Sequence, residues 1–347
     1  MRPLQNVPET NSLQPSPQLH EATLKHLKPS KNLVAFSGGG DSTALFFLLL
    51  EHNIPFDIAH VNYQTREQSD AEEAYAKQLA LTHHKQLFTL TCKLEKSNFE
   101  HHARIERYSF FEKTIKEHGY QTLLTAHHLN DKLEWFLMQL TRGAGLVEML
   151  GMQESEERDS YSILRPLLHL SKKTLQSYLE EREITYFNDE SNASLKHLRN
   201  QFRHHYANPL IEAYETGIAK SFEYMEEDAK RLLPHVAKRI EDLFMIPKDR
   251  DELINIRHID KTLKLLGIVA SKDQRTEILK TESCVIGGKV AVCFAREKIL
   301  IAPYLKVVMN KKFKEICRQE RIPSKIRPYL YVAKIEPSVV FRLDHTL

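Results

Sequence analysis

The chain carries a glycine-rich loop, Ser-Gly-Gly-Gly-Asp-Ser, at residues 37–42. A short run of β-forming residues, 32–36, precedes the loop, and an apolar helical pattern follows it directly. Glycines let backbone N–H groups approach a phosphate closely, and the N-terminus of a helix adds a partial positive charge. The sequence therefore predicts a phosphate site formed by Ser37, Gly38, Gly39, Gly40, Asp41 and Ser42.

Two common phosphate-binding loops do not fit this segment. A Walker A loop ends in Gly-Lys-Ser/Thr, and no lysine follows these glycines. A dinucleotide-binding GxGxxG loop would need glycine where Thr43 stands. A helix cap alone would explain Asp41 or Ser42 but none of the glycines. Because a carboxylate beside phosphates needs a cation between them, Asp41 is predicted to be a ligand of Mg²⁺.

A second group of candidate residues follows a predicted strand over 121–127. Asp131 and Glu134 stand three residues apart on a predicted helix over 130–141, so they share one face. Two such carboxylates can bind a metal or an amine, and an acidic helix start favoured by the helix dipole is the alternative. His127 and His128 are interpreted as strand-end packing and nucleotide contacts rather than as zinc ligands, because no further His or Cys stands at ligand spacing.

Basic residues form local clusters in a chain whose net charge is only +3. Arg104 and Arg107 stand close together, as do Arg199 and Arg203, and residues 306–327 carry eight Lys or Arg against two Glu. A polyanion partner is recognised through such local patches rather than through total charge. Each cluster could also be a solvated surface.

The pattern around these residues alternates short β-rich runs with longer helical segments, which is typical of a parallel sheet wrapped by helices. The predicted strands are 32–36, 56–62, 85–90 and 121–127, and the predicted helices are 42–51, 68–82, 99–118 and 130–141. The fold class is therefore α/β, a doubly wound parallel sheet. A polar and acidic loop is expected around 154–160 and an amphipathic helix from Lys172. A charged helix or helix pair is expected over 218–244, and strands around 285–309.

Four segments are expected along the chain of 347 residues. They are a disordered leader (1–30), a catalytic domain (31–215), a helical linker (216–255) and a small mixed C-terminal domain (256–347). No apolar run approaches the roughly 18 residues that span a bilayer, and the Pro- and Gln-rich start does not resemble a signal peptide. Four cysteines without CxxC spacing indicate free thiols, so a cytoplasmic location is expected.

The loop at 37–42 resembles the SGGxDS loop of N-type ATP pyrophosphatases, also called PP-loop proteins. Five further blocks, in order along the chain, resemble those of tRNA(Ile)-lysidine synthases. These blocks are HVNYQTREQSDAE (60–72), FEHHARIERYSFF (99–111), TAHHLNDKLEWFLMQLTRGAG (125–145), ILRPLL (163–168) and NDESNASLKHLRNQFR (188–203). The chain departs from the family pattern at Thr65, at Asn130, where an Asp is usual, and at Trp135, where a Thr is usual.

The resemblance implies an enzyme that uses ATP and Mg²⁺ to join L-lysine to the wobble cytidine of tRNA(Ile) with a CAU anticodon. It implies that the loop holds pyrophosphate and that Asp131 and Glu134 orient the amine of lysine. It also implies that Arg199 and Arg203 contact the adenylate or RNA phosphates, and that Arg104 and Arg107 lie at the RNA entrance. The C-terminal domain would bind tRNA, and a homodimer is compatible with the resemblance.

Three alternatives remain open on the sequence. A tRNA thiolase of the same fold would need reactive cysteines near the loop, and Cys92 is the one cysteine in the first predicted domain. An amide-forming synthetase of the same superfamily would leave the basic segment 306–327 unexplained. A nucleotide-binding module without catalysis need not keep Asp41, Asp131 and Glu134 together. Pyrophosphate release that requires both lysine and tRNA distinguishes the first interpretation from these.

Overall fold

The computed structural model describes residues 16–65, 68–93, 99–158, 160–188 and 198–342. The chain divides into two compact units, Met1–Glu223 and Tyr224–Leu347. The N-terminal unit contains a mostly parallel sheet, and the C-terminal unit contains an antiparallel sheet. The fold class expected for the first part of the chain is therefore confirmed.

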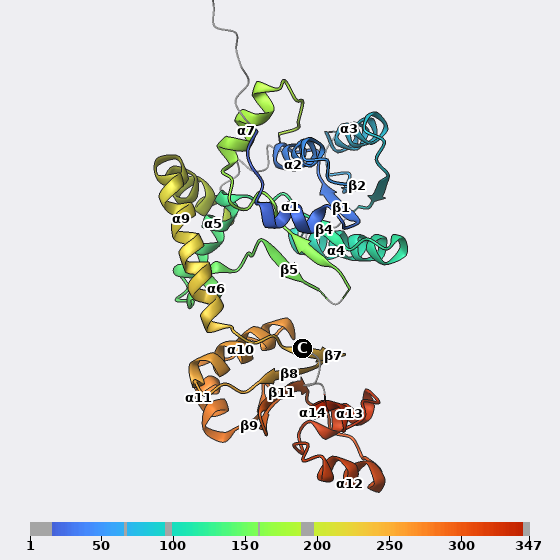
Figure 1. The fold of residues 1–347 in the computed structure, drawn as a ribbon, viewed down its shortest axis with the longest axis vertical. Helices are drawn as coiled ribbons and strands as arrows, with labels where there is room; N and C mark the ends of the chain where they lie inside the picture. Colours follow the sequence, from blue (N-terminus) through green and yellow to red (C-terminus); the bar gives the residue numbers. More distant parts are fainter. Residues whose placement is uncertain (1–15, 66–67, 94–98, 159, 189–197, 343–347) are drawn as a thin grey trace, which may run out of the picture. The chain divides into compact units, whose positions relative to one another are not determined.

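The sheet of the N-terminal unit has the strand order β3-β2-β1-β4-β6-β5 (Figure 1). Every pair is parallel except β5 with β6 at one edge. The strands are β1 (Asn32–Phe36), β2 (Phe56–Asn62), β3 (Leu87–Thr91), β4 (Thr122–Leu124), β5 (Ser155–Glu157) and β6 (Ser162–Leu164). The runs predicted at 32–36 and 56–62 match β1 and β2, whereas β4 ends three residues before the expected 127.

Helices cover both faces of this sheet, because residues along each strand alternate between its two faces. Val34 of β1 packs into one apolar cluster with α1 (Glu21–Leu27), α2 (Gly40–Glu51), α3 (Gln68–Thr82) and α7 (Lys172–Glu181). Leu33 packs on the other side, in a cluster with Phe111 and Ile115 of α4 (Phe99–His118). This two-sided packing is the doubly wound arrangement.

The order of the strands determines where a ligand can bind. β1 pairs with β2 on one side and with β4 on the other, so the segments that follow β1 and β4 diverge at the same edge of the sheet. Such a switch point leaves a crevice at the carboxyl ends of the strands. The glycine-rich loop follows β1, and α5 (Leu129–Leu140) begins shortly after β4. Both candidate groups of residues therefore lie at this crevice.

A run of short helices closes the N-terminal unit. The α6 helix (Leu146–Leu150) follows α5, and α8 (Leu198–Phe202) continues through a π-helical turn, η2 (Arg203–Ala207), into the long α9 (Asn208–Leu232). Both α8 and η2 pack against α5. The part of the 188–203 block at 189–197 lies outside the described residues.

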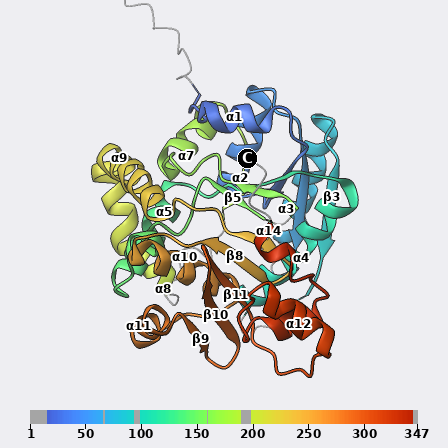
Figure 2. The same ribbon diagram turned by 60° about the horizontal axis from the view of Figure 1, so that its bottom comes forward.

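The C-terminal unit is an antiparallel sheet of order β7-β8-β11-β10-β9 with helices on both faces. Figure 2 shows this sheet between α11 and α12. The α10 and α11 helices pack on one face, and the segments 311–319, 327–332 and 339–342 pack on the other. The elements are β7 (Lys238–Ile240), β8 (Leu243–Pro247), α10 (Glu252–Leu265), α11 (Lys272–Thr281), β9 (Ser283–Ile286), β10 (Val290–Ala295), β11 (Lys298–Pro303), α12 (Lys311–Gln319), α13 (Arg327–Val332) and α14 (Val339–Arg342).

Two expectations for secondary structure are wrong, and each error has a physical cause. The helix expected over 218–244 ends at Leu232, because Pro234 cannot continue a helix and the β-rich run at 243–247 pairs with β11. The acidic stretch expected as a loop around 154–160 contains β5, which forms because β6 offers it an edge for antiparallel pairing. The acidic composition of this stretch gave no indication of the short antiparallel hairpin that it forms with β6.

The range expected as a disordered leader, 1–30, contains the helix α1. Leu27 is fully buried in the core, and the side-chain amide of Asn32 donates to the Leu27 carbonyl at 2.9 Å. The Thr23 hydroxyl donates a short hydrogen bond to Glu154, which also contacts His20 at 2.8 Å. Residues 1–15 of the expected leader lie outside the described residues. Within the part of the chain that the structure describes, no helix combines the length and the apolar character needed to cross a bilayer.

Leu27→Ala tests whether α1 belongs to the core of the N-terminal unit. Removing a fully buried leucine side chain should lower the free energy of unfolding by about 2–5 kcal/mol. Urea denaturation would measure this change, with Lys25→Ala on the exposed side of the same helix as the control. A Leu27→Ala midpoint equal to that of the control would show that residues 21–27 do not contribute to the folded core.

Candidate active site

The glycine-rich loop joins β1 to α2 and is held by its own serines. The Ser42 hydroxyl accepts from the Ser37 amide at 3.2 Å and donates to the Gly39 carbonyl at 3.0 Å. The Phe187 amide donates to the Gly38 carbonyl at 3.0 Å, so a distant segment also fixes the loop. Gly39 is the N-cap of α2 and has no side chain to cap the helix. The first N–H groups of α2 therefore remain available to a ligand.

Two of the three glycines have surroundings that leave little room for a side chain. Gly38 has a φ of +83°, which L-residues rarely adopt, and an added Cβ would lie 3.3 Å from the Cβ of Glu72. At Gly40 an added Cβ would lie 3.2 Å from the Tyr186 ring. The side chains of Glu72 and Tyr186 thus pack against the backbone of the loop. Nothing in the sequence marks these two residues as neighbours of the glycines.

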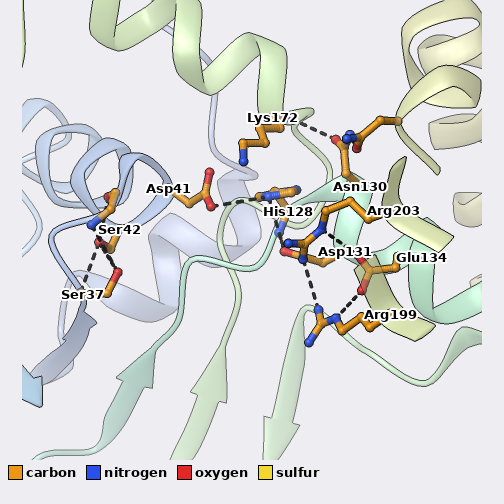
Figure 3. A network of polar contacts seen from close by, with 12 residues as sticks. Ser37, Asp41, Ser42, His128, Asn130, Asp131, Glu134, Lys172, Arg199 and Arg203 are labelled. Atoms are coloured by element: carbon orange, nitrogen blue, oxygen red, sulfur yellow. Dashed lines mark hydrogen bonds and ion pairs between the residues drawn. The ribbon is translucent and has the colours of Figure 1, made fainter. Parts of the chain in front are cut away.

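His128 links the loop to the start of α5 (Figure 3). Its Nε2 atom lies 3.6 Å from a carboxylate oxygen of Asp41 and 3.5 Å from one of Asp131. The imidazole is 4% exposed, whereas the Asp41 side chain remains 36% exposed beside the loop. Burial alone lowers the pKa of His128, but the carboxylates of Asp131 and Asp41 outweigh burial and raise the pKa. His128 is therefore favoured as a cation between two anions.

Asp131 is the third residue of α5, where it takes part in a capping box, and it lies among cations. The His128 backbone amide donates to the Asp131 carboxylate at 3.2 Å. Burial by itself would raise the pKa of Asp131, but His128, His127, Arg199 and Arg203 together lower that pKa far below its usual range. Asp131 therefore stays ionised throughout the physiological range of pH.

Two arginines pair with both acidic residues of α5, as Figure 3 shows. Arg199 donates to Asp131 at 3.3 Å and makes a short contact to Glu134. Arg203 donates to Asp131 at 3.4 Å and to Glu134 at 2.9 Å. The Glu134 side chain is only 1% exposed, and a buried carboxylate needs such partners. The structure thus brings together four residues that the sequence placed in two separate candidate groups.

His127 follows β4 and contacts a hydroxyl group rather than a carboxylate. Its Nδ1 atom lies 2.9 Å from the Thr125 hydroxyl, and burial lowers the pKa of His127 to about 4. The imidazole is therefore neutral at physiological pH. The interpretation of His127 as a nucleotide contact stays a prediction, while its neighbour His128 makes the contacts to Asp41 and Asp131.

Arg104 and Arg107 lie on α4, outside the cluster around Asp131 and Glu134. The Arg104 guanidinium stacks 4.8 Å from the centre of the Tyr108 ring. Among the described residues, neither arginine forms a salt bridge. Arg104 is exposed and Arg107 is half-buried, so both can be reached by a ligand.

The two departures from the family pattern on α5 have structural explanations. The Asn130 side chain accepts from the Lys172 backbone amide at 3.0 Å and donates to Asn208 at 2.9 Å. The Trp135 indole N–H donates to the Glu148 carbonyl at 3.2 Å, and an added Cβ on Gly151 would overlap that ring. Both side chains therefore join α5 to neighbouring segments.

The donor groups at the loop fit a magnesium ion that is shared with a nucleotide. The described residues contain no cluster of three or more metal-ligating side chains. Mg²⁺ is commonly held by one or two carboxylates together with phosphate oxygens and water. Asp41 supplies one accessible carboxylate next to a phosphate loop, which suits this mode of binding.

The chain matches the family model described as a PP-loop domain over residues 13–210. A tRNA(Ile)-lysidine synthase of Campylobacter jejuni is 46% identical over 92% of this chain and 98% of that protein. A tRNA(Ile)-lysidine synthase of Wolinella succinogenes is also 46% identical, over 90% of this chain and 96% of that protein. One of Helicobacter pylori is 43% identical over 89% of this chain and 91% of that protein.

Gly38→Ala tests the backbone requirement of the loop. A side chain at this positive φ should reduce the free energy of unfolding by about 1–2 kcal/mol, and the shifted loop should bind ATP more weakly. Gly217→Ala on α9 is the matched control, because an added Cβ there meets no atom within 4 Å. That change should be neutral or stabilise by about 0.5–1 kcal/mol. Urea denaturation and equilibrium ATP binding would measure both, and equal behaviour of the two variants would contradict the prediction.

Proposed function

The chain belongs to the tRNA(Ile)-lysidine synthase family of PP-loop proteins, and on that premise we propose how its residues carry out the reaction. The enzyme joins L-lysine to C2 of the wobble cytidine of an isoleucine tRNA and uses ATP. The observation that carries this proposal is the phosphate loop linked through His128 to Asp131, which shares its arginine partners with Glu134. A phosphate ligand and an amine ligand can thus bind next to each other.

In the first step, the C2 oxygen of cytosine attacks the α-phosphorus of ATP. The bond from this phosphorus to the bridging oxygen breaks, and pyrophosphate leaves with the electron pair. The N–H groups at the start of α2 and the hydroxyls of Ser37 and Ser42 bind the pyrophosphate as its charge grows. The step is needed because the C2 oxygen is a poor leaving group until it is adenylated.

Magnesium is part of this proposal through the carboxylate of Asp41. Asp41 would hold the ion together with phosphate oxygens of ATP. When bound, the ion neutralises phosphate charge that would otherwise repel Asp41 itself. His128 lies 3.6 Å from the Asp41 carboxylate and holds it on the side of the loop that faces α5.

In the second step, the ε-amine of lysine attacks C2, and AMP leaves with the former C2 oxygen. The amine has an unperturbed pKa of about 10.4, so lysine arrives as an ammonium ion and must lose protons to react. Asp131 stays ionised and Glu134 lies on the same helix face, so the pair suits the binding of a cation. When lysine binds, Arg199 and Arg203 either keep their contacts to the two carboxylates beside the substrate ammonium or give up these contacts to it.

Arg199 and Arg203 have a second role in the proposal. A guanidinium is a planar fork that binds phosphate in a bidentate manner. In the structure the guanidinium groups of both arginines contact carboxylates, and the Arg199 side chain is half exposed. When lysine occupies Asp131 and Glu134, Arg199 can turn to the phosphate of the adenylate or of RNA. Arg104 and Arg107 on α4 would contact RNA phosphates further out.

The finer parts of the proposal concern the partner and the organisation of the chain. We propose a tRNA(Ile) with a CAU anticodon, a cytoplasmic location, and tRNA binding by residues 256–347. The segment bounds 1–30, 31–215, 216–255 and 256–347 stay predictions.

The basic segment 306–327 supports the proposed tRNA contact of the C-terminal domain. Lys325 donates to the Ser283 carbonyl at 2.7 Å and Arg327 to the Ile322 carbonyl at 2.8 Å, so these two serve the fold. The other six basic residues of this segment are exposed. They are Lys306, Lys311, Lys312, Lys314, Arg318 and Arg321.

The function is tested by incubating the protein with ATP, Mg²⁺, L-lysine and tRNA. We expect AMP, pyrophosphate and lysine covalently attached to tRNA. Asp131→Asn should reduce lysine attachment at least about 100-fold, because the variant leaves Arg199 and Arg203 without one ionised partner and weakens the amine site. Asp228→Asn, at an exposed carboxylate of α9, is the control. Release of ADP and phosphate, or tRNA that carries no lysine, would contradict the proposed function.

Lys311→Glu combined with Lys312→Glu tests the proposed tRNA-binding surface. Each phosphate contact that is lost should flatten the dependence of log Kd on log salt by roughly one unit or somewhat less, and affinity at low salt should fall. Lys272→Glu with Lys280→Glu makes the same change of charge on α11 and serves as the control. Filter binding of tRNA across a salt series would measure both slopes. Equal affinities and slopes for the two double variants would mean that α12 is only a solvated surface.

A further inference from the structure

Lys172, the first residue of α7, lies beside the phosphate loop without belonging to it. Its backbone amide donates to Asn130 at the start of α5, and its side chain is half-buried. In Figure 3 this side chain points toward Asp41 and His128. Lys172 lies close enough to His128 for its positive charge to oppose the rise in the His128 pKa that the two carboxylates cause. The ammonium group therefore reaches the crevice between the loop and α5.

Hydrogen bonds of Lys172 and its neighbours fix the backbone at the start of α7. Asn130 accepts from its amide at 3.0 Å, and the same Asn130 side chain donates to Asn208 at 2.9 Å. The preceding residue, Ser171, is fully buried and caps α7 by accepting from the Thr174 amide at 3.2 Å. Such a fixed backbone limits the positions that the Lys172 side chain can reach.

The ammonium of Lys172 has three donors but makes no hydrogen bond or ion pair within the described part of the chain. The other cations at the crevice differ in this respect. Arg199 and Arg203 pair with Asp131 and Glu134, and His128 lies between two carboxylates. Among the described residues, Lys172 is thus the cation beside the loop that remains available to a ligand. The next residue, Lys173, is exposed.

The charges at the loop show why a ligand there needs such a cation. Each phosphate group of a nucleotide carries about one to two negative charges, whereas a helix N-terminus supplies only about half a positive charge. Asp41 adds a negative charge of its own. A bound Mg²⁺ offsets part of this total, and the loop contains no lysine of the Walker A kind. A further positive charge from another element would strengthen phosphate binding at the loop.

We propose that Lys172 is a phosphate-binding residue of the nucleotide site, supplied by α7 rather than by the loop. Its ammonium binds an oxygen of the β-phosphate of ATP. It then neutralises the charge that pyrophosphate gains when the bond between the α-phosphorus and the bridging oxygen breaks. No proton leaves Lys172 in this step. The inference rests on the proposed function for the reaction, but the binding of phosphate can be measured without it.

Asn130 acts as a positioning residue for Lys172. Its amide both accepts from the Lys172 backbone and donates to Asn208, and an aspartate could only accept. The asparagine that replaces the usual family aspartate therefore suits a connection between α5, α7 and α9. Through this connection Asn130 determines where α7 begins and where its first side chain points.

Lys172→Met removes the charge while keeping most of the apolar stem, and Lys173→Met is the matched control on the same helix. We expect Lys172→Met to lower kcat/KM for ATP by about 100–1000-fold and to weaken binding of inorganic pyrophosphate at least tenfold. KM for lysine and affinity for tRNA should stay as in the control, and Lys172→Arg should recover part of the loss. Pyrophosphate binding is measured by calorimetry and turnover by AMP release.

The inference is overturned if Lys172→Met binds pyrophosphate and uses ATP within twofold of Lys173→Met. It is equally overturned if Lys172→Met loses affinity for lysine and tRNA together with ATP and melts at a lower temperature, since that pattern indicates a structural role. If the wild type released no AMP, the proposed function would fail, whereas the pyrophosphate measurement would still decide the role of Lys172.

A double-mutant cycle tests the positioning role of Asn130. Asn130→Ala should weaken pyrophosphate binding in the wild type but add little in the Lys172→Met background, because both changes remove the same contact. Losses that add fully in the double variant would mean that Asn130 only stabilises the fold.

Discussion

The need to pair buried carboxylates organises the catalytic half of this protein. Glu134 is almost completely buried and Asp131 nearly so. An unpaired charge in such surroundings would cost several kcal/mol, so each must have cations in contact. His128 meets Asp131 from the start of α5, and Arg199 and Arg203 meet both acids from α8 and η2. The packing of these helices against α5 thus follows from electrostatics as well as from apolar burial.

The same pairing makes the site ready for charged substrates. Anions and cations alternate from the loop to the arginines, so an arriving phosphate or ammonium can replace a contact that already exists. Exchange of one ionic partner for another avoids the penalty of exposing or burying a bare charge. The sheet supports this arrangement, because β1 and β4 end beside each other at its switch point. A rigid scaffold and exchangeable ion pairs are therefore combined in one crevice.

The local sequence determined much of the fold and part of the site. Strands 32–36 and 56–62 and the helix 99–118 were predictable because alternation and helical periodicity are properties of neighbouring residues. The glycine-rich loop and the shared face of Asp131 and Glu134 were predictable for the same reason. Their chemistry follows from residue types at short spacing.

Only the tertiary structure decided which distant residues meet. Arg199 lies 65 residues from Glu134 along the chain, and the Lys172 amide lies 42 residues from Asn130. No local pattern encodes such contacts, since they depend on the order of strands in the sheet and on how the helices cross it. The burial of α1 and the parallel pairing of β4 with β6 are decided in the same way. The sequence by itself supplied the reactive groups, and long-range packing determined their partners and their ionisation.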